Sequence, residues 1–266
     1  MKLFRDFLIL VIVFAVLWIA FLFVSKSGVL SPDIRIEISM ENEEKLGDLV
    51  MDAFLSNVDL TENRLADSAV YVIHQHLMEG LEYTDFNYQI YVVESPQVNA
   101  FATLGGNIVI FTGLLEFAES PEEVASVLAH EMGHVEHRHV ISKLIKEMGV
   151  TVLFSILGGD LILLSEVSRT ATSTVFDRRM EREADEFALE LLEKSNINPK
   201  SLASFFMRVE REYGGFDKNI EFLMTHPHNQ SRIKMAVEYE TKEDFEEMPI
   251  ALDWDEVRSS IKKNKQ

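Results

Sequence analysis

Cysteine is absent from this chain of 266 residues, so neither a disulfide nor a thiolate metal site is possible. Basic residues are also scarce: 25 Lys and Arg stand against 44 Asp and Glu, and the formal net charge is −19. That charge would repel a phosphate backbone, which argues against nucleic acid as a partner. Apolar residues make up 47%, enough for the packed core of one sizeable domain. Only His, Asp and Glu remain as strong metal ligands.

The longest apolar run lies near the N-terminus. Residues 7–24, FLILVIVFAVLWIAFLFV, are uninterrupted by a polar side chain and follow Lys2 and Arg5. A membrane-crossing helix needs about 17–25 such residues, whereas the apolar part of a signal peptide has about 7–15. We therefore expect an uncleaved single-pass anchor in the lipid bilayer; a signal peptide cleaved near Ser25–Gly28 is the alternative. The basic residues favour a cytoplasmic N-terminus and an extracytoplasmic, periplasmic-side domain.

The remaining pattern predicts a mainly α protein with a small β-sheet, in the α+β class. After a flank at 1–6 and the anchor, residues 25–40 are expected to be a connector and 41–250 one domain, with a polar, frayed tail at 251–266. Apolar spacing and capping residues predict helices near 41–80, 120–149, 177–195, 199–213 and 230–239, and strands over 86–95 and 105–113.

Chemistry is concentrated in VLAHEMGHVEHRH, residues 127–139, which hold four of the eight histidines. Within HEMGH, His130 and His134 lie one helical turn apart, about 5–6 Å at Cβ, so both imidazoles can hold one zinc ion. Glu131 is rotated by about 100° from His130, where its carboxylate reaches a water rather than the metal. This H-E-x-x-H pattern is typical of metalloproteases, but it needs a third ligand.

The third ligand is expected from a second helix. His137 lies about 10 Å from His130 along the helix axis, too far to share a metal, and His139 is likewise expected to face solvent or to contact a ligand from outside. The sequence EREAD places Glu181 and Asp185 one turn apart. Glu181 can coordinate zinc, while Asp185 accepts the free ring N–H of a ligand histidine. The alternative is a salt-bridged helix that faces water.

Together these motifs resemble the HtpX-type, CAAX-prenyl-protease-like family of membrane-associated zinc metallopeptidases, and its BepA-like periplasmic quality-control branch in particular. Four blocks between residues 99 and 233 carry the resemblance: NAFATLGGNIVIFTGLL, HEMGHVEHRH, MEREAD and THPHNQSRI. The resemblance implies a gluzincin-type domain behind one transmembrane helix, with one Zn²⁺ per chain and Glu181 as third ligand. The chain departs from the family pattern at Leu104, where the family usually has Pro, and at Phe176–Arg178, where it has Tyr-Ser-Arg.

The resemblance also implies roles for residues outside the metal-binding motifs. His226 would stabilise the oxyanion or act as a removable fourth ligand, and Arg232 would contact the ligand residues. A histidine that starts a helix and a surface arginine are the alternatives. The strand that contains Asn107, Ile108 and Val109 is expected to pair with an extended substrate by strand addition, a mode that reads backbone and suits unfolded chains. An ordinary inner strand is the alternative.

The apolar segment 150–164, VTVLFSILGGDLILL, constrains the topology. A single crossing of the bilayer here would place His134 and Glu181 on opposite sides of the membrane. The segment must therefore form a hairpin, which either dips into the membrane surface or is buried in the protein.

The predicted function is that of a membrane-anchored zinc metalloendopeptidase acting on unfolded or misfolded envelope proteins. Two alternatives stay open: a zinc-containing chaperone or assembly factor that binds peptide strands without cleaving them, and a CAAX-type prenyl-protein protease. The intact Glu131 disfavours a pure binder, and the single clear span disfavours the multi-span prenyl proteases.

Overall fold

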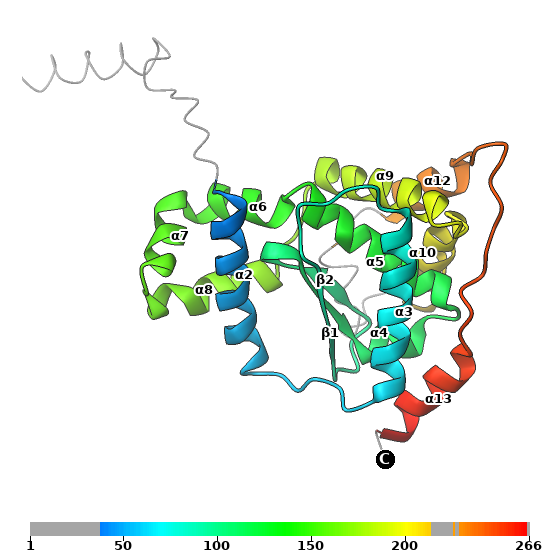
Figure 1. The fold of residues 1–266 in the computed structure, drawn as a ribbon, viewed down its shortest axis with the longest axis horizontal. Helices are drawn as coiled ribbons and strands as arrows, with labels where there is room; N and C mark the ends of the chain where they lie inside the picture. Colours follow the sequence, from blue (N-terminus) through cyan, green and yellow to red (C-terminus); the bar gives the residue numbers. More distant parts are fainter. Residues whose placement is uncertain (1–37, 214–225, 227–228, 265–266) are drawn as a thin grey trace, which may run out of the picture. The chain divides into compact units, whose positions relative to one another are not determined.

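The helices of the protein surround one small sheet in a computed structural model (Figure 1), which describes residues 38–213, 226 and 229–264. The predicted anchor at 7–24 and most of the connector lie outside these residues. Within them, none of the helices combines the length and the apolar character required to cross a membrane. The bounds of the elements are as follows: α2 Met40–Leu55, α3 Arg64–Gly80, β1 Gln89–Val93, β2 Ala100–Ala102, a 3₁₀ turn Leu104–Gly106, β3 Asn107–Phe111, α4 Thr112–Phe117, α5 Pro121–Glu136, α6 His139–Met148, α7 Val150–Leu157, α8 Leu161–Thr172, α9 Arg178–Lys194, α10 Lys200–Tyr213, α12 Asn229–Glu238 and α13 Trp254–Asn264. The prediction of a mainly α protein with a small sheet is confirmed.

The sheet has three strands in the order β1-β3-β2, with β3 parallel to β1 and antiparallel to β2. Successive side chains of β3 point to opposite faces. Ile108 and Ile110 join the core formed with α3 and α5, whereas Val109 and Phe111 pack with Met51 of α2. All five residues of β3 are buried, as its apolar composition requires. The sheet therefore lies between α2 on one face and α3 with α5 on the other (Figure 1).

Helix α5 begins as the sequence predicts. The Ser120 hydroxyl accepts a hydrogen bond from the Glu123 N–H at 3.3 Å, and Pro121 occupies the first turn, where no N–H is needed. The Glu123 carboxylate accepts from the Glu119 N–H at 2.8 Å rather than from the N–H of the cap residue. The predicted start of this helix is confirmed.

The expected single helix over 120–149 is wrong, because it is broken between α5 and α6. Arg138 has φ of 53°, the left-handed conformation that a helix interior does not tolerate. Its guanidinium lies 2.6 Å from the carboxylate of Glu43, which is 3% exposed on α2. Burial raises the pKa of Glu43, while the Arg138 charge offsets part of that rise. This ion pair ties the break to α2 and places His139 at the start of α6.

The expected frayed tail at the C-terminus is also wrong. Residues 254–264 form α13, and the apolar side chains of Trp254, Val257 and Ile261 are buried at helical spacing. The Trp254 indole N–H donates to the Ala118 carbonyl at 2.8 Å. Three apolar residues among eleven were too few to identify an amphipathic helix from the sequence.

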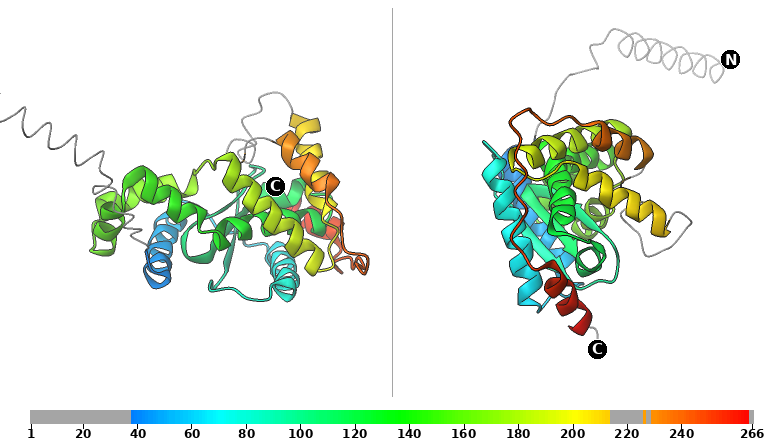
Figure 2. Two further views of the ribbon diagram at one scale, coloured as in Figure 1. Left: turned by 90° about the horizontal axis from the view of Figure 1, so that it is seen from above. Right: turned by 90° about the vertical axis from the view of Figure 1, so that its right-hand side faces the viewer.

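Helices α5 and α9 pack closely where they cross (Figure 2). A Cβ on Gly133 would lie 2.8 Å from the Ala184 carbonyl oxygen, closer than packed atoms allow, so glycine is needed at this position of α5. The close approach brings Glu181 and Asp185 of α9 beside His130 and His134 of α5.

Candidate active site

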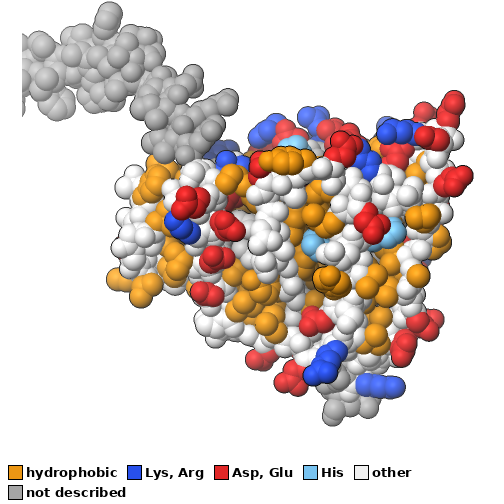
Figure 3. Space-filling model, in the orientation of Figure 1, with side chains coloured by type: hydrophobic (Ala, Val, Ile, Leu, Met, Phe, Trp, Pro, Cys, Tyr) orange, Lys and Arg blue, Asp and Glu red, His pale blue; other side chains and the backbone are white. Residues whose placement is uncertain are grey.

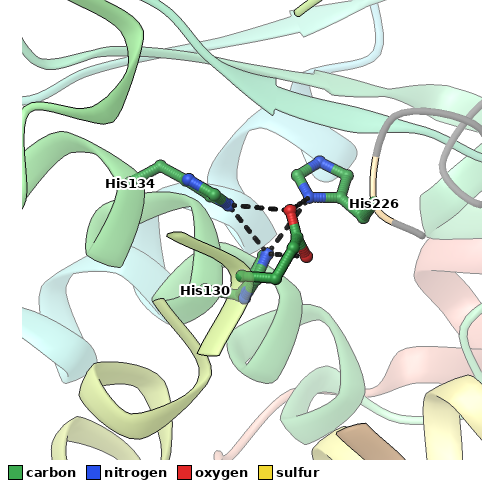
Figure 4. Close-up of side chains that lie close together, drawn as sticks. His130, His134 and His226 are labelled. Atoms are coloured by element: carbon green, nitrogen blue, oxygen red, sulfur yellow. Dashed lines mark hydrogen bonds and ion pairs between the residues drawn. The ribbon is translucent and has the colours of Figure 1, made fainter. Parts of the chain in front are cut away.

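Four buried side chains meet at the crossing of α5 and α9 (Figure 4). His130 and His134 come from α5, Glu181 comes from α9, and His226 lies shortly before α12. One ligand atom from each residue lies within 4.8 Å of all the others, and each residue is at most 2% exposed. The structure therefore brings together the three predicted ligands and adds His226 as a fourth donor.

The spacing of the donor atoms suits one tetrahedral metal ion. His130 Nε2 lies 3.1 Å from His134 Nε2 and 3.2 Å from His226 Nδ1. Glu181 Oε1 lies 3.0 Å from His226 Nδ1 and 3.5 Å from His134 Nε2. A tetrahedron with metal–ligand bonds of about 2.0–2.1 Å has edges of about 3.3–3.4 Å. Three imidazoles and one carboxylate at these separations therefore fit a zinc ion.

The protonation states also fit metal binding. Burial lowers the pKa of His130 to about 4, with the Arg232 charge adding to the effect, and burial holds the pKa of His134 well below its usual value. Both imidazoles are therefore neutral near pH 7 and carry a lone pair. Burial opposes ionisation of Glu181, but the charges of His226 and Arg232 outweigh it and lower its pKa. The carboxylate is consequently ionised.

Asp185 and Arg232 support His130 from behind. The Asp185 Oδ1 atom lies 2.9 Å from His130 Nδ1, in position to accept its N–H, so Nε2 of His130 is left to face the other donors. The Arg232 guanidinium lies 2.6 Å from Asp185 and 2.9 Å from Glu181. Arg232 is 3% exposed, which excludes the surface-arginine alternative. These contacts are the ones that the sequence predicted for the two residues.

Two aromatic rings lie against His134. Phe176 stacks on its imidazole with ring centroids 3.8 Å apart, so this departure from the family pattern contacts a ligand directly. His139 Nδ1 lies 2.9 Å from His134 Nδ1. His139 is 3% exposed, whereas His137 is exposed, so of the two open readings His139 takes the contact with a ligand and His137 takes the solvent.

Glu131 is held beside the donors without belonging to them. Its Oε2 accepts a hydrogen bond from the Ala102 N–H of β2 at 2.7 Å, and its Oε1 lies 3.4 Å from His226 Nε2. Burial raises the pKa of Glu131 to about 7, against the lowering effect of the His226 charge. A carboxylate with this pKa exchanges a proton readily near neutral pH, as a general base requires.

His226 bridges the two carboxylates of the site. Its Nδ1 faces Glu181 and its Nε2 faces Glu131. Burial disfavours its charged form, but these two negative charges outweigh that effect and raise its pKa. In the neutral form Nδ1 offers a lone pair to a metal; in the charged form both nitrogens are hydrogen-bond donors.

The strand predicted to bind substrate is not available for pairing. Asn107, Ile108 and Val109 belong to β3, whose two edges pair with β1 and β2, so the prediction of strand addition to these residues is wrong. The Asn107 side chain donates to the Leu104 carbonyl at 2.7 Å and closes the turn before β3. Within the described residues β2 pairs on one side only and contacts Glu131 through the Ala102 N–H. Its three residues carried too little pattern to be predicted as a strand.

This fold and this site define a metallopeptidase: a buried H-E-x-x-H helix crossed by a helix that supplies a glutamate and an aspartate. The comparison of residues 65–240 with known families matches the model of peptidase family M48. The chain therefore belongs to peptidase family M48, which confirms the resemblance noted in its motifs.

Individual relatives agree with this assignment. The chain is similar to the mitochondrial metalloendopeptidase OMA1 of Arabidopsis thaliana, with 31% identity over 215 residues that cover 79% of this chain and 43% of the relative. It is also similar to the beta-barrel assembly-enhancing proteases of Yersinia pestis (26% over 225 residues, 78% of this chain and 46% of the relative) and Escherichia coli K12 (24% over 213 residues, 75% and 44%). The chain spans less than half the length of these relatives.

Proposed function

We propose that the protein is a membrane-anchored, zinc-dependent endopeptidase that cleaves unfolded or damaged polypeptides. One observation carries the proposal: His130, His134 and Glu181 offer converging ligand atoms, while Glu131 is held beside them with a pKa of about 7. A bound zinc ion would polarise the scissile carbonyl and lower the pKa of a water molecule. Glu131 accepts the proton of the attacking water and returns it to the departing amine. His226 donates a hydrogen bond to the oxyanion when its nitrogen faces the substrate.

The proposed substrate site is the outer edge of β2. An extended peptide paired there would pass the Glu131 carboxylate, because the Ala102 N–H already contacts that carboxylate at 2.7 Å. Main-chain pairing supplies affinity without a required side-chain sequence, so it suits unfolded chains of many sequences. Folded proteins do not present an extended strand, which favours damaged proteins as substrates. A role in protein quality control agrees with the names of the beta-barrel assembly-enhancing relatives.

Zinc content and cleavage of casein by the full-length chain in detergent test the proposal. We expect about one zinc ion per chain and cleavage of casein, an unfolded substrate, because all three ligands and the base are in place. A chelator should abolish cleavage and added zinc should restore it. Bound zinc without cleavage of any unfolded substrate would support the non-cleaving binding factor instead, and a chain without zinc would contradict the assignment of the ligands.

Strand pairing makes a prediction about the substrate backbone. In a fluorogenic model peptide, N-methylation of a residue next to the scissile bond removes one N–H donor. We expect kcat/KM to fall by about 2–13-fold for each hydrogen bond lost, from a net value of about 0.5–1.5 kcal/mol per bond. The same methylation at the far end of the peptide is the control. Equal rates for both peptides would count against pairing at β2.

The helical hairpin of α7 and α8 is proposed to contact the lipid surface. Exposed apolar residues gather at its turn: Phe154 is 44% exposed, Leu161 73% and Ile162 85%. The one charged side chain between Glu147 and Glu166 is Asp160, whose carboxylate accepts from two N–H groups at the start of α8. Figure 3 shows hydrophobic side chains at the end of the molecule formed by these helices. Such a surface is costly in water and is stabilised by a membrane interface.

The absence of cysteine allows a direct test of this contact. A single Ile162→Cys substitution, labelled with an environment-sensitive fluorophore, should report an apolar environment when the full chain is reconstituted into lipid vesicles. Met248→Cys is the matched control, because Met248 is an apolar residue 51% exposed on the C-terminal segment. The control label should remain in water. A label at position 162 that behaves like the control would show that the hairpin does not meet the lipid.

A further inference from the structure

The two ligand histidines on α5 are supported in different ways. His130 Nδ1 lies 2.9 Å from the carboxylate of Asp185, which is fully buried. His134 has no carboxylate at the corresponding position: its Nδ1 lies 2.9 Å from Nδ1 of another histidine, His139. The other nitrogen of His139, Nε2, lies 3.2 Å from the carboxylate of Glu183.

The geometry determines where the protons lie along this chain of contacts. His134 Nε2 points towards the other donors, 3.1 Å from His130 Nε2, so it offers the lone pair to a metal. The proton of His134 is then on Nδ1. Two N–H groups cannot face each other at 2.9 Å, so His139 Nδ1 must be the acceptor. The proton of His139 is therefore on Nε2, where it is donated to Glu183.

The arrangement also avoids adding negative charge to the site. Three carboxylates, those of Glu131, Glu181 and Asp185, are already buried there. A further carboxylate against His134 would repel them in a medium of low dielectric constant. The neutral imidazole of His139 instead carries the hydrogen-bond chain to Glu183, whose side chain is 29% exposed and pairs with Arg179 at 2.8 Å.

The break between α5 and α6 makes this contact possible. His139 is the first residue of α6, and it follows Arg138, whose left-handed backbone and ion pair with Glu43 redirect the chain. Had α5 continued as one helix, residue 139 would be rotated by about 500° from residue 134, or about 140° after one full turn, and would point away from it.

We propose that His139 is a positioning residue that holds His134 in its Nδ1–H tautomer and fixes its ring orientation, with Glu183 holding His139 in turn. The inference rests on the proposed function, since it assigns the support of a ligand in that same site. Partners that hydrogen-bond a metal-binding histidine typically contribute about 10–100-fold to metal affinity. His139 therefore acts on zinc affinity without contacting the metal or the substrate.

Zinc affinities of full-length variants, measured by competition with a chelating dye, test this role. His139→Leu removes the acceptor and should weaken zinc binding by about 10–100-fold. His139→Asn places an amide oxygen near the position of Nδ1, so it should recover most of that loss. His139→Gln places its amide near the position of Nε2 and should not. His137→Asn, at the neighbouring exposed histidine, should bind zinc as the wild type does. Unchanged affinity in His139→Leu, or an Asn variant as weak as the Leu variant, would overturn the proposal.

Histidine tautomers in the zinc-loaded wild type provide a readout that does not depend on the variants folding. Long-range ¹H–¹⁵N NMR of histidine-labelled protein should place the proton of His134 on Nδ1 and that of His139 on Nε2. A proton on Nδ1 of His139 would overturn the proposal. A wild-type chain that binds no zinc would overturn the proposed function as well, whereas a zinc-binding wild type with the wrong His139 tautomer would overturn this inference alone.

Discussion

Replacing Glu131 with glutamine is expected to lower kcat/KM by about 10²–10⁴-fold, the usual contribution of a general base. Glutamine has nearly the same shape, and its amide oxygen can still accept the Ala102 N–H that holds this side chain at 2.7 Å. It cannot accept a proton from water. Glu131 is not among the converging ligand residues, so zinc should remain bound at about one ion per chain.

The matched control is Glu136→Gln on the same helix. Glu136 accepts hydrogen bonds from the hydroxyls of Tyr88 and Thr84 at 2.7 and 2.6 Å, and glutamine can accept both. Its activity should stay at the wild-type level. Casein cleavage and zinc content are measured on the same preparations. A Glu131→Gln variant that keeps both its zinc and its activity would rule out Glu131 as the base.

Replacing Glu181 with alanine is expected to remove zinc and activity together. This change deletes one of the four converging ligand atoms, so the loss of zinc affinity should exceed the roughly 10–100-fold that follows when a partner of a ligand is lost. Arg232 would also lose the carboxylate oxygen that lies 2.9 Å from its guanidinium, leaving more positive charge in the site. That charge further disfavours a cation.

Glu186→Ala is the control for this variant, because Glu186 lies on the same helix with its side chain 57% exposed. It should retain zinc and activity. Circular dichroism of both variants checks that α9 is still folded. Retention of stoichiometric zinc by a folded Glu181→Ala variant would show that the metal is held by a different set of residues. The pair of substitutions at Glu131 and Glu181 thus separates loss of the base from loss of the metal.

The metal-binding residues were predictable because their geometry is local. In a helix, residues four apart lie on the same face, so HEMGH on its own places His130 and His134 side by side. The same argument pairs Glu181 with Asp185. Their approach to α5 was inferred from the need for a third ligand. The structure adds the physical reason, which is that Gly133 allows α9 to cross within contact distance of the α5 backbone.

Several features were mispredicted because nothing local in the sequence indicates them. The central position of β3 depends on β2, which has only three residues. The break at Arg138 depends on an ion pair with Glu43, 95 residues away in the sequence. The helix at 254–264 is held by burial of Trp254 against the Ala118 carbonyl, a contact between distant segments. Each outcome depends on long-range packing, which local propensity does not contain.

The sequence by itself determined the ligand type, the spacing of the ligands, the catalytic carboxylate and the family. It did so because the absence of cysteine, the helical period and the short motifs are local properties. Only the tertiary structure decided which strand edge lies beside Glu131, how far His226 and Arg232 enter the site, and which histidine supports His134. Those contacts join residues up to 102 positions apart, and they exist only because the packing of α5, α9 and α12 brings them together.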